Sequence, residues 1–217
     1  MIIKLRDPVN GLTHCIGAIL SVLGLIVLIC KSMNPAKPLH LVTFSIFGGS
    51  LILLYTISTL YHWLPFSEKG IQRLRRMDHM MIFILIAATY TPICLVALKG
   101  VWGWSIFGSV WGLAVLGIFL KIFWLQAPRW FSTTVYVLMG WVAIVGVLPL
   151  IKALGLGGFL WILIGGLFYT CGAVIYALKK PNPWPRYFGF HEIFHLFVML
   201  GSLSHFWLMY EYVTKFN

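Results

Sequence analysis

The chain has 217 residues, of which 60% are hydrophobic, 16% aromatic and only 10% charged, and its mean hydropathy is +0.93. A water-soluble domain of this length could not bury so much apolar surface, so the composition predicts an all-α protein that crosses a membrane several times. The formal net charge of +11 is explained by basic loops that contact anionic lipid headgroups, and nucleic-acid binding is not expected.

A window of about 20 residues, the length that crosses a bilayer, predicts seven transmembrane helices. In chain order they cover residues 11–31, 40–64, 78–98, 101–121, 134–152, 158–178 and 191–213. The first span lacks the small-residue cleavage site of a signal peptide and should be retained. Since no linker is long enough to hold another domain, residues 1–217 are expected to form a single seven-helix domain.

Lysine and arginine are distributed unevenly over the two sides of this arrangement. The N-terminal segment and the second, fourth and sixth loops carry eleven basic residues, and the opposite side carries five. An excess of this kind on short loops predicts the cytoplasmic side. We therefore expect a cytoplasmic N-terminus, an external C-terminus and a place in the inner or plasma membrane.

Five polar residues lie at the cytoplasmic ends of the predicted spans. They are Ser58 and His62 at the end of the second span, Asp78 at the start of the third, and His191 and His195 at the start of the last. Ionisable side chains in spanning helices are costly and usually face the bundle interior with a partner. The two members of each pair are four residues apart and share one helical face. The five side chains are therefore expected to meet at one membrane depth.

Three imidazoles at one depth are a typical ligand set for a metal ion. Zinc is the expected metal, because three nitrogen ligands leave one position of its tetrahedral shell open for water. Closed structural sites are typically rich in thiolates instead. The pattern predicts Zn²⁺ bound by His62, His191 and His195.

The order and spacing of these residues resemble the hemolysin III family. The resemblance also covers the opening run DPVNGLTH at residues 7–14 and the run GFHEIFH at residues 189–195. This family belongs with the progestin and adipoQ receptors, which include the adiponectin receptors, and more distantly resembles the alkaline ceramidases. The resemblance implies seven helices with the N-terminus inside, zinc bound by three histidines and, in the eukaryotic relatives, hydrolysis of a lipid amide.

The resemblance also implies roles for single residues. Asp78 matches the carboxylate that holds the zinc-bound water, and such a carboxylate can act as general base. Ser58 matches the serine one turn before the first ligand, and its hydroxyl could donate to a developing oxyanion. The alternative for Ser58 is a packing role, with its hydroxyl bonded to its own helix. Asp7 departs from the family, in which glutamate is commoner, so its role stays open.

The other histidines carry weaker expectations. His14 could donate a hydrogen bond to a ligand, or it could serve in capping or packing. His79 lies about 100° around the helix from Asp78 and is expected at the membrane interface, as is His40. His205 lies too far along its helix from His191 to share its metal, about 21 Å by the helical rise, and no purpose is assigned to it.

Three other function classes remain alternatives. The run His191-Glu192-Ile-Phe-His195 satisfies the H-E-x-x-H pattern of zinc proteases, but no aspartate follows Asp78 and Gly201 stands where an extended motif needs histidine. A pore or cytolysin would need a continuous polar seam. A receptor would use zinc only to brace helices. We expect a zinc-dependent hydrolase of a lipid-like amide or ester, with membrane lipids as its partners.

Overall fold

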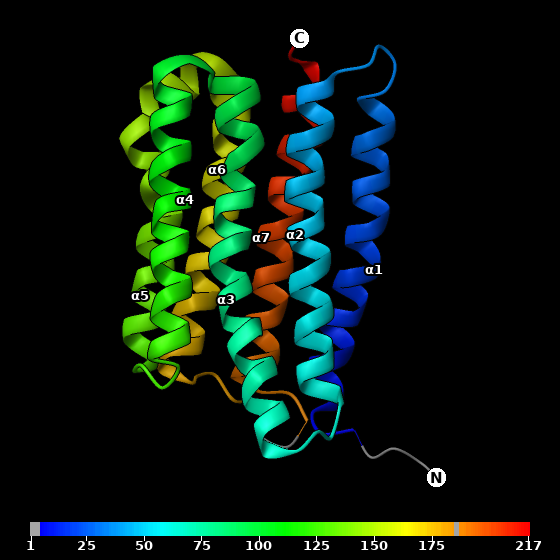
Figure 1. The fold of residues 1–217 in the computed structure, drawn as a ribbon, viewed down its shortest axis with the longest axis vertical. Coiled ribbons are helices and arrows are strands. Elements are labelled where there is room, and N and C mark those ends of the chain that lie inside the picture. Colours follow the sequence, from blue (N-terminus) through cyan, green and yellow to red (C-terminus); the bar gives the residue numbers. More distant parts are fainter. Residues whose placement is uncertain (1–4, 185–186) are drawn as a thin grey trace.

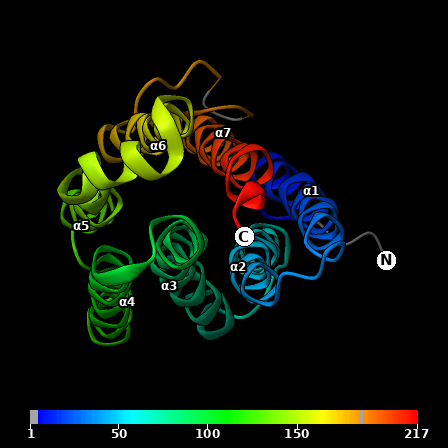
Figure 2. The same ribbon diagram turned by 90° about the horizontal axis from the view of Figure 1, so that it is seen from above.

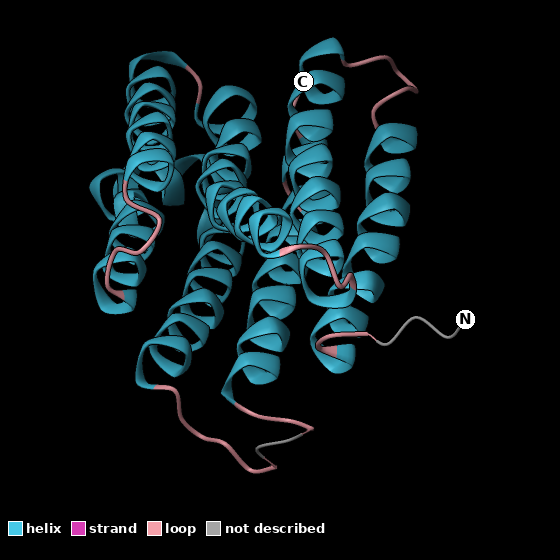
Figure 3. Ribbon diagram, turned by 60° about the horizontal axis from the view of Figure 1, so that its bottom comes forward, coloured by secondary structure: helices cyan, strands magenta, loops and turns pink. Residues whose placement is uncertain are grey.

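The computed structural model describes residues 5–184 and 187–217, and the regular structure of these residues is helical. The long helices are α1 (Pro8–Lys31), α2 (Pro38–Trp63), α3 (Glu68–Pro92), α4 (Gly100–Phe123), α5 (Arg129–Gly140), α6 (Val147–Leu178) and α7 (Phe190–Glu211). Three short segments extend them, η1 (Ile93–Leu98), η2 (Trp141–Gly146) and η3 (Val213–Lys215). Figure 3 shows helices joined directly by loops. The expected all-helical membrane architecture is thus present.

Six helical stretches are long and apolar enough to cross a membrane by length and composition. The fifth of them, Arg129–Leu178, has 50 residues and combines α5, η2 and α6. It is broken at Gly155, where φ is 68° and ψ is 170°. The chain folds back there: Trp141 Nε1 donates to Thr170 Oγ1 over 2.9 Å, whereas 29 residues of straight helix would separate the two by about 43 Å. Figure 2 shows α5 and α6 side by side.

The start of α3 differs from the prediction. The helix begins at Glu68 and not at residue 78, so Asp78 lies ten residues inside the helix and does not open it. Ser67 is the N-cap and accepts a hydrogen bond from the Gly70 amide over 3.4 Å, and Glu68 suits the positive end of the helix dipole. A hydropathy window misses these turns because they are polar.

The end of α3 changes its helical type at Pro92. Proline has no amide hydrogen, which interrupts the regular pattern of α-helical hydrogen bonds. The helix continues as the π-helix η1. π-helical turns are a usual response to such an interruption of the α-helical pattern.

The helices form a ring in which α7 returns beside α1 (Figure 2). α3 is the most enclosed of the spanning stretches, since 72% of its apolar window is buried compared with 22% for α1. Large apolar side chains such as Leu116, Leu148 and Val145 point outward and remain exposed, as expected for surfaces that face lipid. The N-terminal end of α1 and the C-terminal end of the chain lie at opposite ends of the bundle (Figure 1).

Candidate metal centre

Three histidines meet where α2 ends and α7 begins. His62 lies in the last turn of α2, and His191 and His195 lie in the first turns of α7. One nitrogen atom from each ring lies within 4.8 Å of the corresponding atoms of the other two. His62 and His195 are buried. Among the described residues these three side chains form a group that could hold a metal ion.

The separation of the ring nitrogens fits a shared tetrahedral ion. The Nε2 atoms of His62 and His191 lie 3.3 Å apart. Zinc binds imidazole nitrogen at about 2.0–2.1 Å, which places two ligands of a tetrahedron about 3.3–3.4 Å from each other. The donor atoms of His62 and His191 are therefore spaced as two ligands of one zinc ion would be.

The outer nitrogens of two rings have partners that fix their protonation. His62 Nδ1 donates to the carboxylate of Asp7 over 3.1 Å. His195 Nδ1 lies 3.1 Å from Thr13 Oγ1, and this hydroxyl donates its own hydrogen to the Asn10 carbonyl over 2.8 Å. Thr13 must therefore accept from His195, so both rings carry their proton on Nδ1. Each then presents the lone pair of Nε2, as a metal ligand does.

Asp7 is held in place by the backbone that surrounds it. Its amide donates to the His62 carbonyl over 2.9 Å, and Trp63 Nε1 donates to the carbonyl of Pro8 over 3.0 Å. These contacts tie the N-terminal segment to the end of α2. The hydrogen bond from His62 is the main cause that lowers the pKa of Asp7, and partial burial opposes it. Asp7 therefore stays ionised beside the imidazole.

From the sequence, the role of Asp7 stayed open and Thr13 was not singled out. His14 had two interpretations there, a hydrogen-bond donor or a capping or packing residue. Its ring stacks on that of His195, with centroids 3.6 Å apart and an interplanar angle of 8°. Neither ring nitrogen of His14 has a hydrogen-bond partner among the described residues. Of the two interpretations of His14, packing is the one that its contacts match.

Asp78 and Ser58 line one cavity together with His191 and His195. Ser58 is buried and lies beside the carboxyl group of Asp78, with His62 also near this carboxyl. Asp78 does not belong to the group formed by His62, His191 and His195. Its carboxyl group therefore lies next to the candidate metal centre but outside the candidate ligand set.

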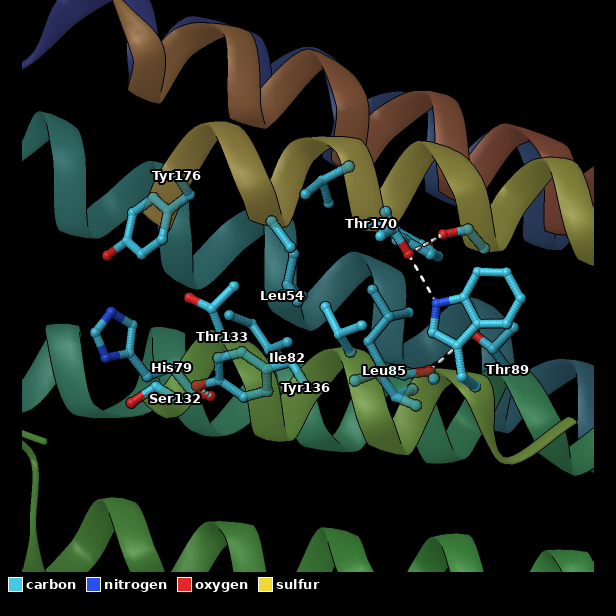
Figure 4. Close-up of a pocket in the computed structure, with 18 of the residues that line it drawn as sticks. Leu54, His79, Ile82, Leu85, Thr89, Ser132, Thr133, Tyr136, Thr170 and Tyr176 are labelled. Atoms are coloured by element: carbon cyan, nitrogen blue, oxygen red, sulfur yellow. Dashed lines mark hydrogen bonds between the residues drawn. The ribbon is translucent and has the colours of Figure 1, made fainter. Parts of the chain in front are cut away.

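The cavity extends from these polar groups along an apolar wall. In Figure 4 the cavity has one polar end with His79 and Tyr176 and a second polar region with Thr89 and Thr170. Leu54, Ile82 and Leu85 lie between the two. α3 supplies much of this wall, because its enclosed position turns several of its faces toward the bundle interior. The cavity is therefore polar beside the candidate metal centre and apolar along part of its length.

Three further histidines lie away from the ligand group. His40 is buried, with Nε2 3.1 Å from the Val213 carbonyl. His79 lines the cavity. The expected place of both at the membrane interface stays a prediction. His205 is buried and lines the cavity as well.

Glu192 faces the backbone of its own helix start. Its Oε2 accepts a hydrogen bond from the amide of Gly189 over 2.8 Å. This is the contact of a capping carboxylate at the N-terminus of a helix. Among the residues that the structure describes, His191 and His195 line the cavity, and Glu192 does not.

Sequence comparisons place these features among known proteins. The family described as "Haemolysin-III related" matches residues 3–206. "Hemolysin-3 homolog" of Bacillus subtilis (strain 168) is 39% identical over 210 residues, which are 97% of this chain and 95% of that protein. "Hemolysin-3" of Bacillus cereus is 40% identical over 210 residues, 96% of this chain and 92% of that protein. "Monocyte to macrophage differentiation factor" of Homo sapiens is 23% identical over 178 residues, which are 80% of this chain and 71% of that protein.

Proposed function

Because this chain belongs to the Haemolysin-III-related family of multi-pass membrane proteins, we propose that it is a zinc-dependent hydrolase of a lipid-like amide or ester. The observation that carries this proposal is the set of three imidazoles that each bring one ring nitrogen within 4.8 Å of the others, while Asp7 and Thr13 accept hydrogen bonds from Nδ1 of His62 and His195. Three protein ligands leave tetrahedral zinc one open position, which is the pattern of catalytic sites.

The side chains around the centre have complementary roles in the proposed reaction. Bound zinc supplies Lewis acidity and lowers the pKa of water toward about 7. Asp78 takes the proton of the attacking water as general base and delivers it to the leaving group. The Ser58 hydroxyl donates a hydrogen bond to the substrate oxygen as negative charge develops on it. Asp7 and Thr13 orient the rings of His62 and His195.

The proposed substrate follows from the wall of the cavity. Leu54, Ile82 and Leu85 line the part that extends away from His79, the neighbour of Asp78 on α3 (Figure 4). Such a wall excludes water and holds a hydrocarbon chain, while polar groups at one end fix the orientation of the reacting bond. Membrane lipids are therefore the proposed source of the substrate.

The proposal includes seven membrane crossings by a single domain over residues 1–217. The reversal at Gly155 supports it, because it divides the 50-residue stretch into two antiparallel parts. An odd number of crossings agrees with chain ends on opposite sides of the bundle (Figure 1). The excess of basic residues on one side supports a cytoplasmic N-terminus and an external C-terminus in the inner or plasma membrane.

An intramembrane protease would use Glu192 as its base. The hydrogen bond from the Gly189 amide engages that carboxylate in helix capping instead, whereas Asp78 lines the cavity. This contrast favours Asp78 as the base and argues against the H-E-x-x-H mechanism.

A cytolytic function is the second candidate, because two similar proteins carry the name hemolysin. A conducting pore needs a continuous polar path, and the apolar wall around Leu54, Ile82 and Leu85 does not supply one. Lysis caused by lipid products of hydrolysis would fit both the name and the cavity. A receptor with structural zinc would bind the metal without any turnover.

Metal analysis of the purified protein tests the basis of the proposal. Wild-type protein should contain about one zinc ion per chain, and the His191→Ala/His195→Ala double variant should contain almost none. His40→Ala is a matched control, since His40 is buried near Val213 at the far end of α2. Full zinc retention in the double variant would contradict the proposed site.

A further inference from the structure

A second group of charged side chains lies in the wall of the same cavity. Arg75 on α3, Lys121 on α4 and Arg129 at the start of α5 all line it. His79 lies among them, near enough to each of the three to interact with it electrostatically. Figure 4 shows His79 at one end of the cavity with Ser132 and Tyr176. We call Arg75, Lys121 and Arg129 the basic cluster.

The positive charge of the basic cluster is not balanced by acids. The chain has five acidic residues, all of which lie in the described ranges. None of them forms an ion pair with the cluster; the pairs that the structure contains involve Asp7 and Glu211. Asp78 is the one acid in the described cavity wall. Three cations therefore face one carboxylate, and this end of the cavity is formally positive.

Lys121 is the most informative member of the cluster. It is 1% exposed, and its ammonium group donates to Ser132 Oγ over 2.5 Å. An ammonium group has three donors, and Ser132 is its one hydrogen-bond partner among the described residues. Burial of a charge without an acidic partner is costly. A lysine that served only to hold α4 against α5 would not need this charge.

The cluster also adjoins the groups proposed to carry the reaction. Arg75, Asp78 and His79 are spaced i, i+3 and i+4 on α3 and therefore lie on one face of this helix. His79 Nδ1 is buried and has no hydrogen-bond partner in residues 5–184 or 187–217. A ligand oxyanion at this point would satisfy polar atoms that the protein leaves free.

The remainder of the cavity defines the shape of that ligand. Leu54, Ile82 and Leu85 continue the wall away from His79 (Figure 4). A positive end followed by an apolar wall matches an amphiphile with an anionic group and a hydrocarbon chain. Arginine and lysine are the side chains that most often bind phosphate and carboxylate oxygens.

We propose that the basic cluster binds the phosphate or carboxylate of an anionic lipid whose chain lies along the apolar wall. This inference rests on the proposed function, since it names the substrate class of the same cavity. The anionic group would be held within about one helical turn of Asp78, so the lipid would enter with a fixed orientation.

Binding of two lipids with one acyl chain tests the proposal. The probes are 1-oleoylglycerol 3-phosphate and the uncharged 1-oleoylglycerol, titrated into metal-stripped protein in an uncharged detergent. Metal removal prevents direct binding of the phosphate to zinc. Wild-type protein should bind the phosphate lipid at least about tenfold more tightly, the scale of one hydrogen bond to a charged group. Lys121→Met should remove most of this preference, and Lys121→Arg should retain it.

Matched variants separate a local effect from a general loss of positive charge. Lys69→Met removes an exposed lysine at the start of α3 and should leave the preference unchanged. If Lys121→Met does not fold, Arg75→Gln provides the same test with a partly exposed side chain. Equal affinity of the two lipids for the wild type, or an undiminished preference in the folded cluster variant, would overturn the proposal.

A third probe, inorganic phosphate, identifies the source of the anion. Displacement of the phosphate lipid only by a large excess of inorganic phosphate would support a lipid ligand. Binding of inorganic phosphate as tight as that of the lipid would overturn it in favour of a free anion. Because the protein is metal-free, the result is independent of zinc binding and turnover. Turnover without a charge preference would refute this inference alone. A charge preference in a protein that binds no zinc in the metal analysis would refute the proposed function alone.

Discussion

Single hydrogen bonds decide which ring nitrogen His62 and His195 can offer to a metal ion. The sequence spacing predicted that His62, His191 and His195 would share a site, because residues four apart lie on one helical face. It could not show which ring nitrogen faces inward. Asp7 and Thr13 determine this by accepting from Nδ1, and both come from a segment far from the ligands in sequence.

Replacement of Asp7 tests this arrangement. Asp7→Asn keeps the size of the side chain but removes the charge that supports His62. Zinc affinity should fall about 10–100-fold, as is usual when such a partner is lost. A chelator competition measures this affinity. Glu68→Gln, which alters an exposed acid at the start of α3, should have no effect, and unchanged affinity in Asp7→Asn would contradict the assignment.

The two carboxylates near the centre lead to a second prediction. Asp78→Asn should lower lipid amide or ester turnover about 100–10,000-fold, the contribution of a general base, and should leave much of the zinc in place. Glu192→Gln should cost little turnover, because Glu192 caps α7. A screen of lipid substrates with matched zinc measurements would check both variants. The reverse order of severity would favour a zinc protease, and no turnover in the wild type would favour structural zinc.

Two helical segments each owe their form to one residue. Pro92 converts the end of α3 into a π-helix, and Gly155 reverses the long stretch that contains α5 and α6. The hydropathy pattern separated residues 134–152 from 158–178, and Gly155 lies between these ranges. The start of α3 was misplaced because its first turns are polar, and a window that scores hydrophobicity does not register an N-cap such as Ser67.

Gly155 carries a prediction about stability. Its φ of 68° and ψ of 170° lie in a region that is essentially restricted to glycine, so Gly155→Ala should lower the free energy of unfolding by about 1–3 kcal/mol. Gly166→Ala is the matched control in the same helix, since a Cβ there has nothing within 4 Å. It should be neutral or stabilising by up to about 1 kcal/mol. Thermal unfolding in detergent compares the two, and equal stability would contradict a reversal that requires glycine.

On the scale of the whole molecule, the ring of helices closes because α7 packs against α1. This contact brings Thr13 to His195 and places the first turns of α1 and α7 around one centre. All seven long helices contribute residues to the cavity wall, so the cavity lies inside the ring.

Membrane topology is the prediction at this scale. Reporter fusions should place the loop before Arg73 in the cytoplasm and Asn217 outside, since eleven basic residues lie on one side and five on the other. A fusion in the loop that begins at Lys179 should report the same side as Arg73 and serves as an internal control. A cytoplasmic Asn217 would contradict either seven crossings or their direction.

The sequence by itself determined the membrane class, the helical architecture and the identity of the three histidines, because composition and a spacing of four residues act locally. Only the tertiary structure decided which partners these residues have. It placed Thr13 on His195, stacked His14 without a hydrogen bond and set Lys121 against Ser132 in a positively charged cavity wall. The first two contacts join α1 to α7, and the third joins α4 to α5. No local pattern encodes them, since they depend on how the ring of helices closes.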